Sequence, residues 1–327
     1  MSKPRLLLVP GFTELEWVIK PRLEQWAEVA SYDPPGVGEE PLTQEQQERL
    51  QSGEAIRREA IAKRGLDELE RRGWDRCFLV SDGDGNGASA LIAQARPEAI
   101  QGMALGHATL SYDMEGERAP INKEVWLAMR QLLQQDYPSF VRHGIVQLTQ
   151  GAYRDELAER MLERFPRELV EGGWDMARDE PVDIGEILLK VGCPLLLAKH
   201  DGCLGFTEEG FEDAVAAFPE ARTLSVPEAC AVSDRVADAL RSFCLEVMEM
   251  EGSRREQAVQ IGSKSFRILV ELAPSDPHHA PADGVQGAVA SPVALVGGGG
   301  SVGRGAVQLD DQSLPAPQTV GLDPRAP

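Results

Sequence analysis

Six short apolar runs, separated by segments with helical periodicity, constrain the fold of this chain more than any other feature of its sequence. The runs, which we predict to be strands, lie at residues 6–9, 29–32, 76–80, 100–105, 194–198 and 222–226. The segments between them are long enough for the crossover connections that parallel strands require. The alternation therefore predicts an α/β fold built on a mostly parallel, doubly wound sheet of about six strands. Ligands of such sheets bind outside the carboxyl ends of the strands.

Residues 112–185 interrupt this alternation, because they contain helical patterns and no clear strand. The insertion follows a strand end, on the side of the sheet where ligands bind. We therefore predict that it forms a helical cap over the site, with a simple enlargement of the core as the alternative. The core domain then comprises residues 1–111 and 186–250.

The composition changes near residue 250, where we place the end of the folded domain. Residues 272–327 contain 9 Gly and 8 Pro among 56 residues, or about 30%, which is typical of low-complexity chains. All five Trp lie before residue 251, so this segment lacks the large apolar side chains that offset the entropy of ordering. We predict a disordered C-terminal tail over residues 251–327. Within it, residues 266–272 are apolar enough to form a short strand or a docking segment instead.

Charge and cysteine usage exclude several classes of function. The 33 Lys and Arg against 53 Asp and Glu give a net charge of −20, which opposes binding to nucleic acid. The apolar runs are too short for a signal peptide or a membrane span, so we predict a cytoplasmic protein that does not bind membranes. The five cysteines are odd in number and lack CxxC spacing, which indicates reduced thiols. We predict neither a metal site nor a cofactor.

Six segments near the strand ends carry motifs in a fixed order. They lie at residues 7–12, 32–38, 78–88, 194–201, 218–222 and 226–231. In this order they resemble the α/β-hydrolase fold family over about residues 4–248. The resemblance implies that residues 10–12 form the oxyanion loop and that residues 78–88 form the strand, the nucleophile elbow and the helix after it.

The resemblance does not extend to the catalytic residues, apart from the acid, whose position is Asp201. The gapless register places Gly83 at the nucleophile position, and glycine has no side chain. The histidine position is Ala231, so the imidazole that would move the proton is absent as well. A glycine-rich elbow without a triad also resembles the N-myc downstream-regulated proteins, a branch of the fold. We therefore predict a non-hydrolytic pseudoenzyme.

A relocated catalytic site is the alternative, because ionisable side chains remain at the strand ends. His107 or His200 is a candidate general base, and Asp201 or Asp84 is the carboxylate that would act with it. Such a site would make the chain an atypical esterase, thioesterase or lyase. Adjacent side chains on a strand point to opposite faces, so we do not expect His200 and Asp201 to share one pocket.

The nucleophile of that relocated site would be a cysteine on a neighbouring loop, Cys203 or Cys230, although cysteines of this kind usually serve packing. Asp84 becomes a further candidate nucleophile if the elbow register shifts by one residue. It would then resemble the carboxylate of haloalkane dehalogenases and epoxide hydrolases. This register needs a gap before Pro97 and still lacks a histidine at Ala231.

Three loops supply the predicted binding residues. We expect the ligand to contact Pro10, Gly11, Phe12, Gly83, Asp84, Gly85 and Cys230. The ligand class that fits an apolar pocket beneath a cap is a small apolar or acyl molecule. A protein partner, including a second copy of this chain, is the other expectation. A third hypothesis places the function in the tail, residues 251–327.

Overall fold

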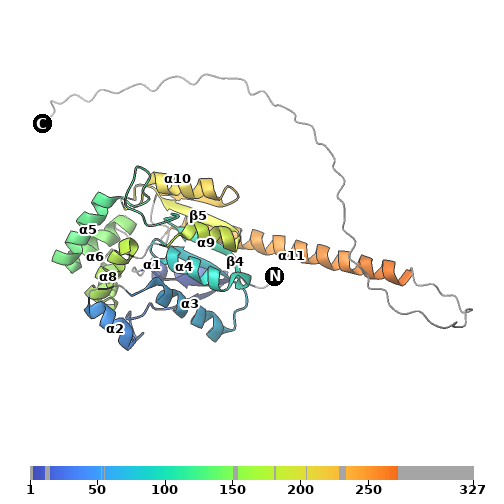
Figure 1. Ribbon diagram of the computed structural model, residues 1–327, viewed down its shortest axis with the longest axis horizontal. Helices are drawn as coiled ribbons and strands as arrows, with labels where there is room; N and C mark the ends of the chain where they lie inside the picture. Colours follow the sequence, from blue (N-terminus) through green and yellow to red (C-terminus); the bar gives the residue numbers. More distant parts are fainter. Residues whose placement is uncertain are drawn as a thin grey trace, which may run out of the picture. The chain divides into compact units, whose positions relative to one another are not determined.

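The computed structural model describes residues 3–11, 15–52, 54, 56–149, 154–179, 182–203, 205–227 and 233–271 (Figure 1). Its six strands are β1 (Arg5–Val9), β2 (Glu28–Ser31), β3 (Cys77–Asp82), β4 (Ile100–Gly106), β5 (Leu195–His200) and β6 (Arg222–Val226). Each overlaps a strand predicted from an apolar run. The predicted α/β fold class is therefore confirmed.

All six strands are parallel and follow the order β2-β1-β3-β4-β5-β6. The first strand, β1, lies one place in from the edge of the sheet; β2 pairs with it as the edge strand, and the chain then crosses to β3 on its other side. The order thus reverses between β1 and β3, and doubly wound sheets bind ligands outside the carboxyl ends at such a point.

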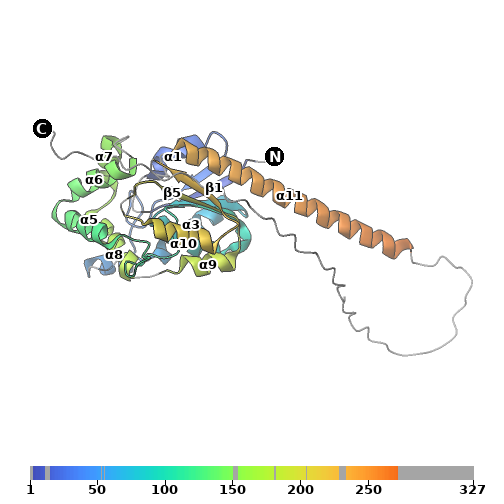
Figure 2. The ribbon, with the colours of Figure 1, turned by 90° about the horizontal axis from the view of Figure 1, so that it is seen from above.

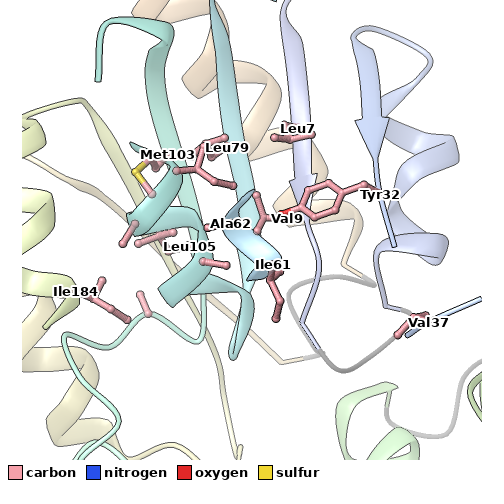
Figure 3. Packing of buried hydrophobic residues seen from close by; sticks show 14 of the residues in the cluster. Leu7, Val9, Tyr32, Val37, Ile61, Ala62, Leu79, Met103, Leu105 and Ile184 are labelled. Atoms are coloured by element: carbon pink, nitrogen blue, oxygen red, sulfur yellow. The ribbon is translucent and has the colours of Figure 1, made fainter. Parts of the chain in front are cut away.

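Helices cover both faces of the sheet, as Figure 2 shows. On one face lie α1 (Leu15–Leu23) and α11 (Asp234–Glu271); on the other lie α3 (Arg58–Arg72), α4 (Gly85–Ala95), α9 (Ile184–Val191) and α10 (Glu208–Ala217). Side chains of β1 alternate between them: Leu6 and Leu8 pack toward α1 and α11, whereas Leu7 and Val9 join the other cluster (Figure 3). Burial of each such leucine contributes roughly 1.5–3 kcal/mol. Among the described residues, no helix is both long and apolar enough to cross a membrane.

Among the described residues, four helices precede α9 in the segment between β4 and β5. They are α5 (Lys123–Gln135), α6 (Tyr137–Thr149), α7 (Arg154–Arg164) and α8 (Arg167–Asp179). The rings of Trp126 and Trp174 stack at 4.3 Å between α5 and α8, and Phe140 packs edge-on against Trp174 at 5.2 Å. Arg164 forms an ion pair with Asp33 in the loop after β2, so α7 contacts the carboxyl-end side of the sheet.

A further short helix, α2 (Gln44–Gln51), lies between β2 and α3. Its N-terminus is closed by a capping box: Gln46 N donates to Thr43 Oγ1 at 3.3 Å, and Thr43 N donates to Gln46 Oε1 at 2.8 Å. The Thr-x-x-Gln spacing produces this arrangement, because the two side chains satisfy each other's free amides.

Helix α11 extends past the predicted start of the tail. It continues from Asp234 to Glu271 as one helix, past the boundary placed at residue 250. Glu251 accepts hydrogen bonds from Arg76 and, at 3.0 Å, from Gln101 Nε2, so this residue is fastened to the sheet. Residues 251–271 contain no Pro, which lets helical hydrogen bonding continue, and the enrichment in Gly and Pro begins only after them. Residues 266–271, for which a short strand or a docking segment was the alternative to disorder, lie within this helix, and residues 272–327 lie outside the described part.

Candidate functional site

The turn between β3 and α4 has the shape of an elbow without a nucleophilic side chain. Gly83 adopts φ +50°, in the left-handed region that glycine tolerates best. Its N–H donates to Gly106 O at 3.1 Å. A Cβ atom built on Gly83 would lie 3.7 Å from the ring of Phe206, so this ring stands over the position of the missing side chain.

The loop after β1 packs closely against this elbow. A Cβ atom on Gly85 would lie 2.8 Å from the backbone oxygen of Val9 and 3.3 Å from backbone atoms of Pro10. A Cβ atom on Gly11 would lie 3.4 Å from Gly85 N. The structure thus brings the predicted binding residues Pro10, Gly11 and Gly85 together, and only residues without a Cβ atom allow the approach at Gly85.

Asp84 begins α4 in a buried network. Burial raises the pKa of Asp84 to about 6, and the positive charge of Arg58 opposes this rise. The hydroxyl of Tyr112 donates to Gly83 O at 2.9 Å and accepts from Gly87 N at 3.2 Å. The guanidinium carbon of Arg58 lies 4.6 Å from the centre of the Tyr112 ring. Arg58 and Tyr112 therefore fix the turn around Asp84.

His107 follows β4 and is held in one orientation by a carboxylate. Among the described residues other than glycine, His107 has a positive φ, of 45°. Its side chain is buried. Its Nδ1–H donates to Asp82 Oδ1 at 2.6 Å. The same ring stacks on Phe206 with centroids 5.0 Å apart. Because Nδ1 faces Asp82, Nε2 is the nitrogen that remains for a proton or a ligand.

His200 and Cys203 complete a cluster with His107. The rings of His107 and His200 meet edge to face at 5.8 Å. One side-chain nitrogen of each histidine and the sulfur of Cys203 all lie within 4.8 Å of one another. β5 brings His200 beside the end of β4, and the loop after β5 returns Cys203 to the same place.

The surroundings of Cys203 stabilise its thiolate. Burial alone would raise the pKa of this thiol, but hydrogen bonds with His107 and His200 outweigh burial and lower the pKa to about 5. Cys193 provides a contrast in the same chain, because burial raises the pKa of its thiol to about 12. A thiolate is the nucleophilic form of cysteine and the form that binds metals.

A cavity of about 150 Å³ opens beside this cluster. Phe206 and Phe211 form apolar parts of its wall, and His107, His200 and Cys203 line it as well. Thr109 also lines the cavity; its side chain is buried, and its hydroxyl has no hydrogen-bond partner among the described residues. Buried polar groups are usually satisfied, so this hydroxyl is available to a bound molecule.

Asp201 lies apart from this cluster. Its side chain is exposed, accepts a hydrogen bond from Ser225 on β6 and lies 4.0 Å from Lys199 Nζ. The carboxylate that contacts His107 is Asp82. Three positions of the sequence analysis, Phe12, Cys230 and Ala231, fall outside the described residues.

The sequence analysis placed His107 or His200 with Cys203 or Cys230 in one relocated site, but gave Asp201 or Asp84 as the carboxylate of that site. The strand register brings in Asp82 instead: Asp82 on β3 pairs with Gly106 on β4, the residue before His107. Residues at the ends of paired parallel strands share one edge of the sheet.

No family model matches the sequence, and no curated protein is significantly similar to it. Solved structures do match. A hydrolase from Oleispira antarctica superposes with a TM-score of 0.60 at 13% identity, over 75% of this chain and 92% of that one. An enol-lactonase from Burkholderia xenovorans superposes with a TM-score of 0.54 at 15% sequence identity, over 76% of this chain and 92% of that one. A bromoperoxidase from Bacillus anthracis superposes with a TM-score of 0.60 at 16% sequence identity, over 76% of this chain and 92% of that one.

The chain has the α/β-hydrolase fold. This confirms the fold inferred from the six motif segments. Identities below 20% carry no information on chemistry. Within the α/β-hydrolase fold, the elbow of this chain holds Gly83, and the ionisable cluster is built from the ends of the next two strands, β4 and β5.

Proposed function

We propose that this chain hydrolyses small esters or thioesters with Cys203 as the nucleophile, His107 as the proton carrier and Asp82 as the group that orients His107. One observation carries the proposal: Asp82 holds His107 Nδ1 at 2.6 Å, and the ring contacts Cys203 beside a cavity. A nucleophile, a base and a third group that orients the base form the recurring arrangement of covalent acyl transfer.

The reaction proceeds in two steps. The sulfur of Cys203 attacks the acyl carbon, the bond to the alcohol or thiol leaving group breaks, and the imidazolium of His107 gives that group its proton. His107 then takes a proton from water, and the hydroxide displaces Cys203 from the acyl carbon. The carboxylic acid leaves and the thiolate is restored. Asp82 keeps its charge throughout and stabilises the imidazolium.

The cavity limits the substrate. Its volume of about 150 Å³ lies below the roughly 300–1,000 Å³ of sites for drug-sized ligands, so short acyl groups fit best. Phe206 and Phe211 supply apolar contacts to such a group. The free hydroxyl of Thr109 is the donor that we propose for the acyl oxygen.

Non-hydrolytic binding of a small acyl ligand or a protein partner is the second proposal, and a different observation favours it. Gly83 carries no side chain, and the Phe206 ring stands over the position where the fold normally presents its nucleophile. The same cavity would then bind an acyl ligand without turning it over.

Purified full-length protein, treated with a chelator, should be assayed against acetyl, butyryl and octanoyl esters and thioesters. We expect turnover of the short substrates, with a loss of at least about tenfold in Cys203→Ser, His107→Asn and Asp82→Asn, equivalent to about 1.4 kcal/mol of transition-state stabilisation. Asn suits position 107 because it tolerates positive φ better than most residues.

Two matched controls distinguish loss of the catalytic relay, Asp82–His107–Cys203, from general damage to the fold. Cys193→Ser removes another cysteine, and Asp201→Asn removes an exposed carboxylate; both should keep the parent rate. Turnover that survives Cys203→Ser contradicts the thiol mechanism. Folded parent protein without turnover on any substrate supports the binding function instead, and calorimetry with short-chain carboxylates then tests the cavity.

A further inference from the structure

We propose that His107, His200 and Cys203 bind one divalent ion of the zinc class at the ends of β4 and β5, with a fourth coordination position open to the cavity. Two imidazoles and a thiolate suit zinc and its neighbours in the first transition series far better than magnesium or calcium. This inference does not rest on the proposed hydrolysis, because His200 is essential to the ion and is not part of the Asp82–His107–Cys203 relay.

The distances fit a tetrahedral site. The three ligand atoms lie within 4.8 Å of one another. With zinc bonds of about 2.0–2.3 Å, neighbouring ligand atoms of a tetrahedral site are separated by roughly 3.3–3.7 Å. The three ligand atoms therefore have to approach one another by, at most, about 1 Å or somewhat more to reach tetrahedral separations.

Asp82 prepares His107 to bind a metal. Histidines that coordinate metals almost always donate their other ring N–H to a carboxylate, a carbonyl or water, which fixes the tautomer and makes the coordinating nitrogen more basic. The contact between His107 Nδ1 and Asp82 Oδ1, at 2.6 Å, is of this kind. It directs Nε2 away from Asp82, as coordination by that nitrogen requires.

His200 supplies an independent observation. Its side chain is only 8% exposed, and its Nδ1 has no hydrogen-bond partner among the described residues. Leaving such a buried polar atom unsatisfied costs roughly 1–3 kcal/mol. Nδ1 of His200 is therefore open to a partner that is not a protein atom, and the cavity that the residue lines gives an ion a route of entry.

The charges of the site balance. A divalent ion with one thiolate and two neutral imidazoles has a net charge of +1, which the carboxylate of Asp82 compensates. Lys199 also lines the cavity, but its ammonium is paired with Glu208. With three protein ligands and a cavity in front of them, the fourth position is open to water or a small anion, as in catalytic zinc sites.

Occupancy has a consequence for the thiol. A metal bound to the sulfur of Cys203 withdraws that sulfur from the relay with His107. The proposed thiol hydrolysis and metal binding then exclude each other at one site.

The test uses full-length protein that has been treated with a chelator, with Co²⁺ as the spectroscopic probe. We expect one equivalent of Co²⁺ to produce a sulfur-to-metal charge-transfer band and the visible bands of a tetrahedral site, and one equivalent of Zn²⁺ to remove both. Cys203→Ser should abolish the charge-transfer band. His200→Gln should weaken metal affinity at least about tenfold.

Two controls carry matched changes. His143→Gln removes an exposed histidine on α6, and Cys193→Ser removes a different thiol; both should leave the titration unchanged. Absence of the bands in the parent protein, or an unchanged charge-transfer band in Cys203→Ser, overturns the proposal. The circular dichroism of each variant is compared with the parent, and His200→Gln decides the matter if Cys203→Ser does not fold.

Ester turnover distinguishes failure of the metal proposal from failure of the proposed hydrolysis. His200→Gln should weaken metal binding; its turnover is not expected to match that of the metal-free parent, because His200 also lowers the pKa of Cys203 and lines the cavity. Loss of turnover in Cys203→Ser together with the absence of any Co²⁺ band would support the relay alone. A band without turnover would support the metal site alone.

Discussion

Alkylation of Cys203 tests the electrostatics of the cluster most directly. With a pKa of about 5, the thiol of Cys203 is about 90% ionised at pH 6, whereas an unperturbed thiol with a pKa of ~8.5 is about 0.3% ionised. Thiolates of lower pKa are weaker nucleophiles, by roughly 40-fold over this difference. The two effects leave Cys203 roughly sevenfold faster than an ordinary thiol at pH 6. Its rate should stay nearly flat from pH 6 to 8, where an ordinary thiol accelerates about tenfold per pH unit.

Chelator-treated protein is exposed to iodoacetamide for timed intervals at pH 4 to 8, and peptide mass spectrometry follows each cysteine. Cys193, whose pKa burial raises to about 12, serves as the internal reference and should react roughly 10³-fold more slowly at pH 6. His107→Asn removes the first of the hydrogen bonds that lower the Cys203 pKa, so its pH profile should move upward. A Cys203 rate that climbs tenfold per unit between pH 6 and 8 in the parent protein would refute the reasoning.

Four further outcomes follow from the packing of the described residues. Gly85→Ala should lower the free energy of unfolding by about 2 kcal/mol, because its Cβ would lie 2.8 Å from the backbone oxygen of Val9; an unchanged denaturation midpoint would contradict this close approach. Gly83→Ser should cost about 1 kcal/mol from positive φ, as its Cβ atom would meet nothing closer than 3.7 Å, and a denaturant melt as stable as the parent would argue against the elbow. Glu251→Gln should lower stability by about 1 kcal/mol in the same assay if the first part of α11 depends on its ion pair with the sheet. Thr109→Val should leave thermal stability unchanged, because the hydroxyl has no protein partner, but should raise KM for short esters; an unchanged KM would remove Thr109 from the site.

The sheet could be predicted from the sequence because each strand is a short apolar run between helical segments. A continuous apolar run such as Leu6 to Val9 is typical of a strand that is buried on both faces of a sheet. The gapless alignment also predicted glycine at the elbow, and Gly83 lies in the turn between β3 and α4 with positive φ. Both inferences depend on local sequence alone.

The pairing of Asp82 with His107 could not be predicted in the same way. It depends on the register that sets Asp82 opposite Gly106 and on the left-handed backbone of His107, a conformation without a sequence signal. Cys203 joins them only because β5 lies beside β4. The continuation of α11 past residue 250 has no signal in the composition, because the contact of Glu251 with Arg76 joins distant parts of the chain.

The bent turn at Gly83 keeps the geometry of an elbow but has no hydroxyl group to offer. Fluorophosphonate reagents identify serine hydrolases by forming a covalent bond with that hydroxyl, and their target is missing from this turn. A proteome profiled with such reagents would not report this turn. Thiol-directed electrophiles would instead report on Cys203, on the loop after β5.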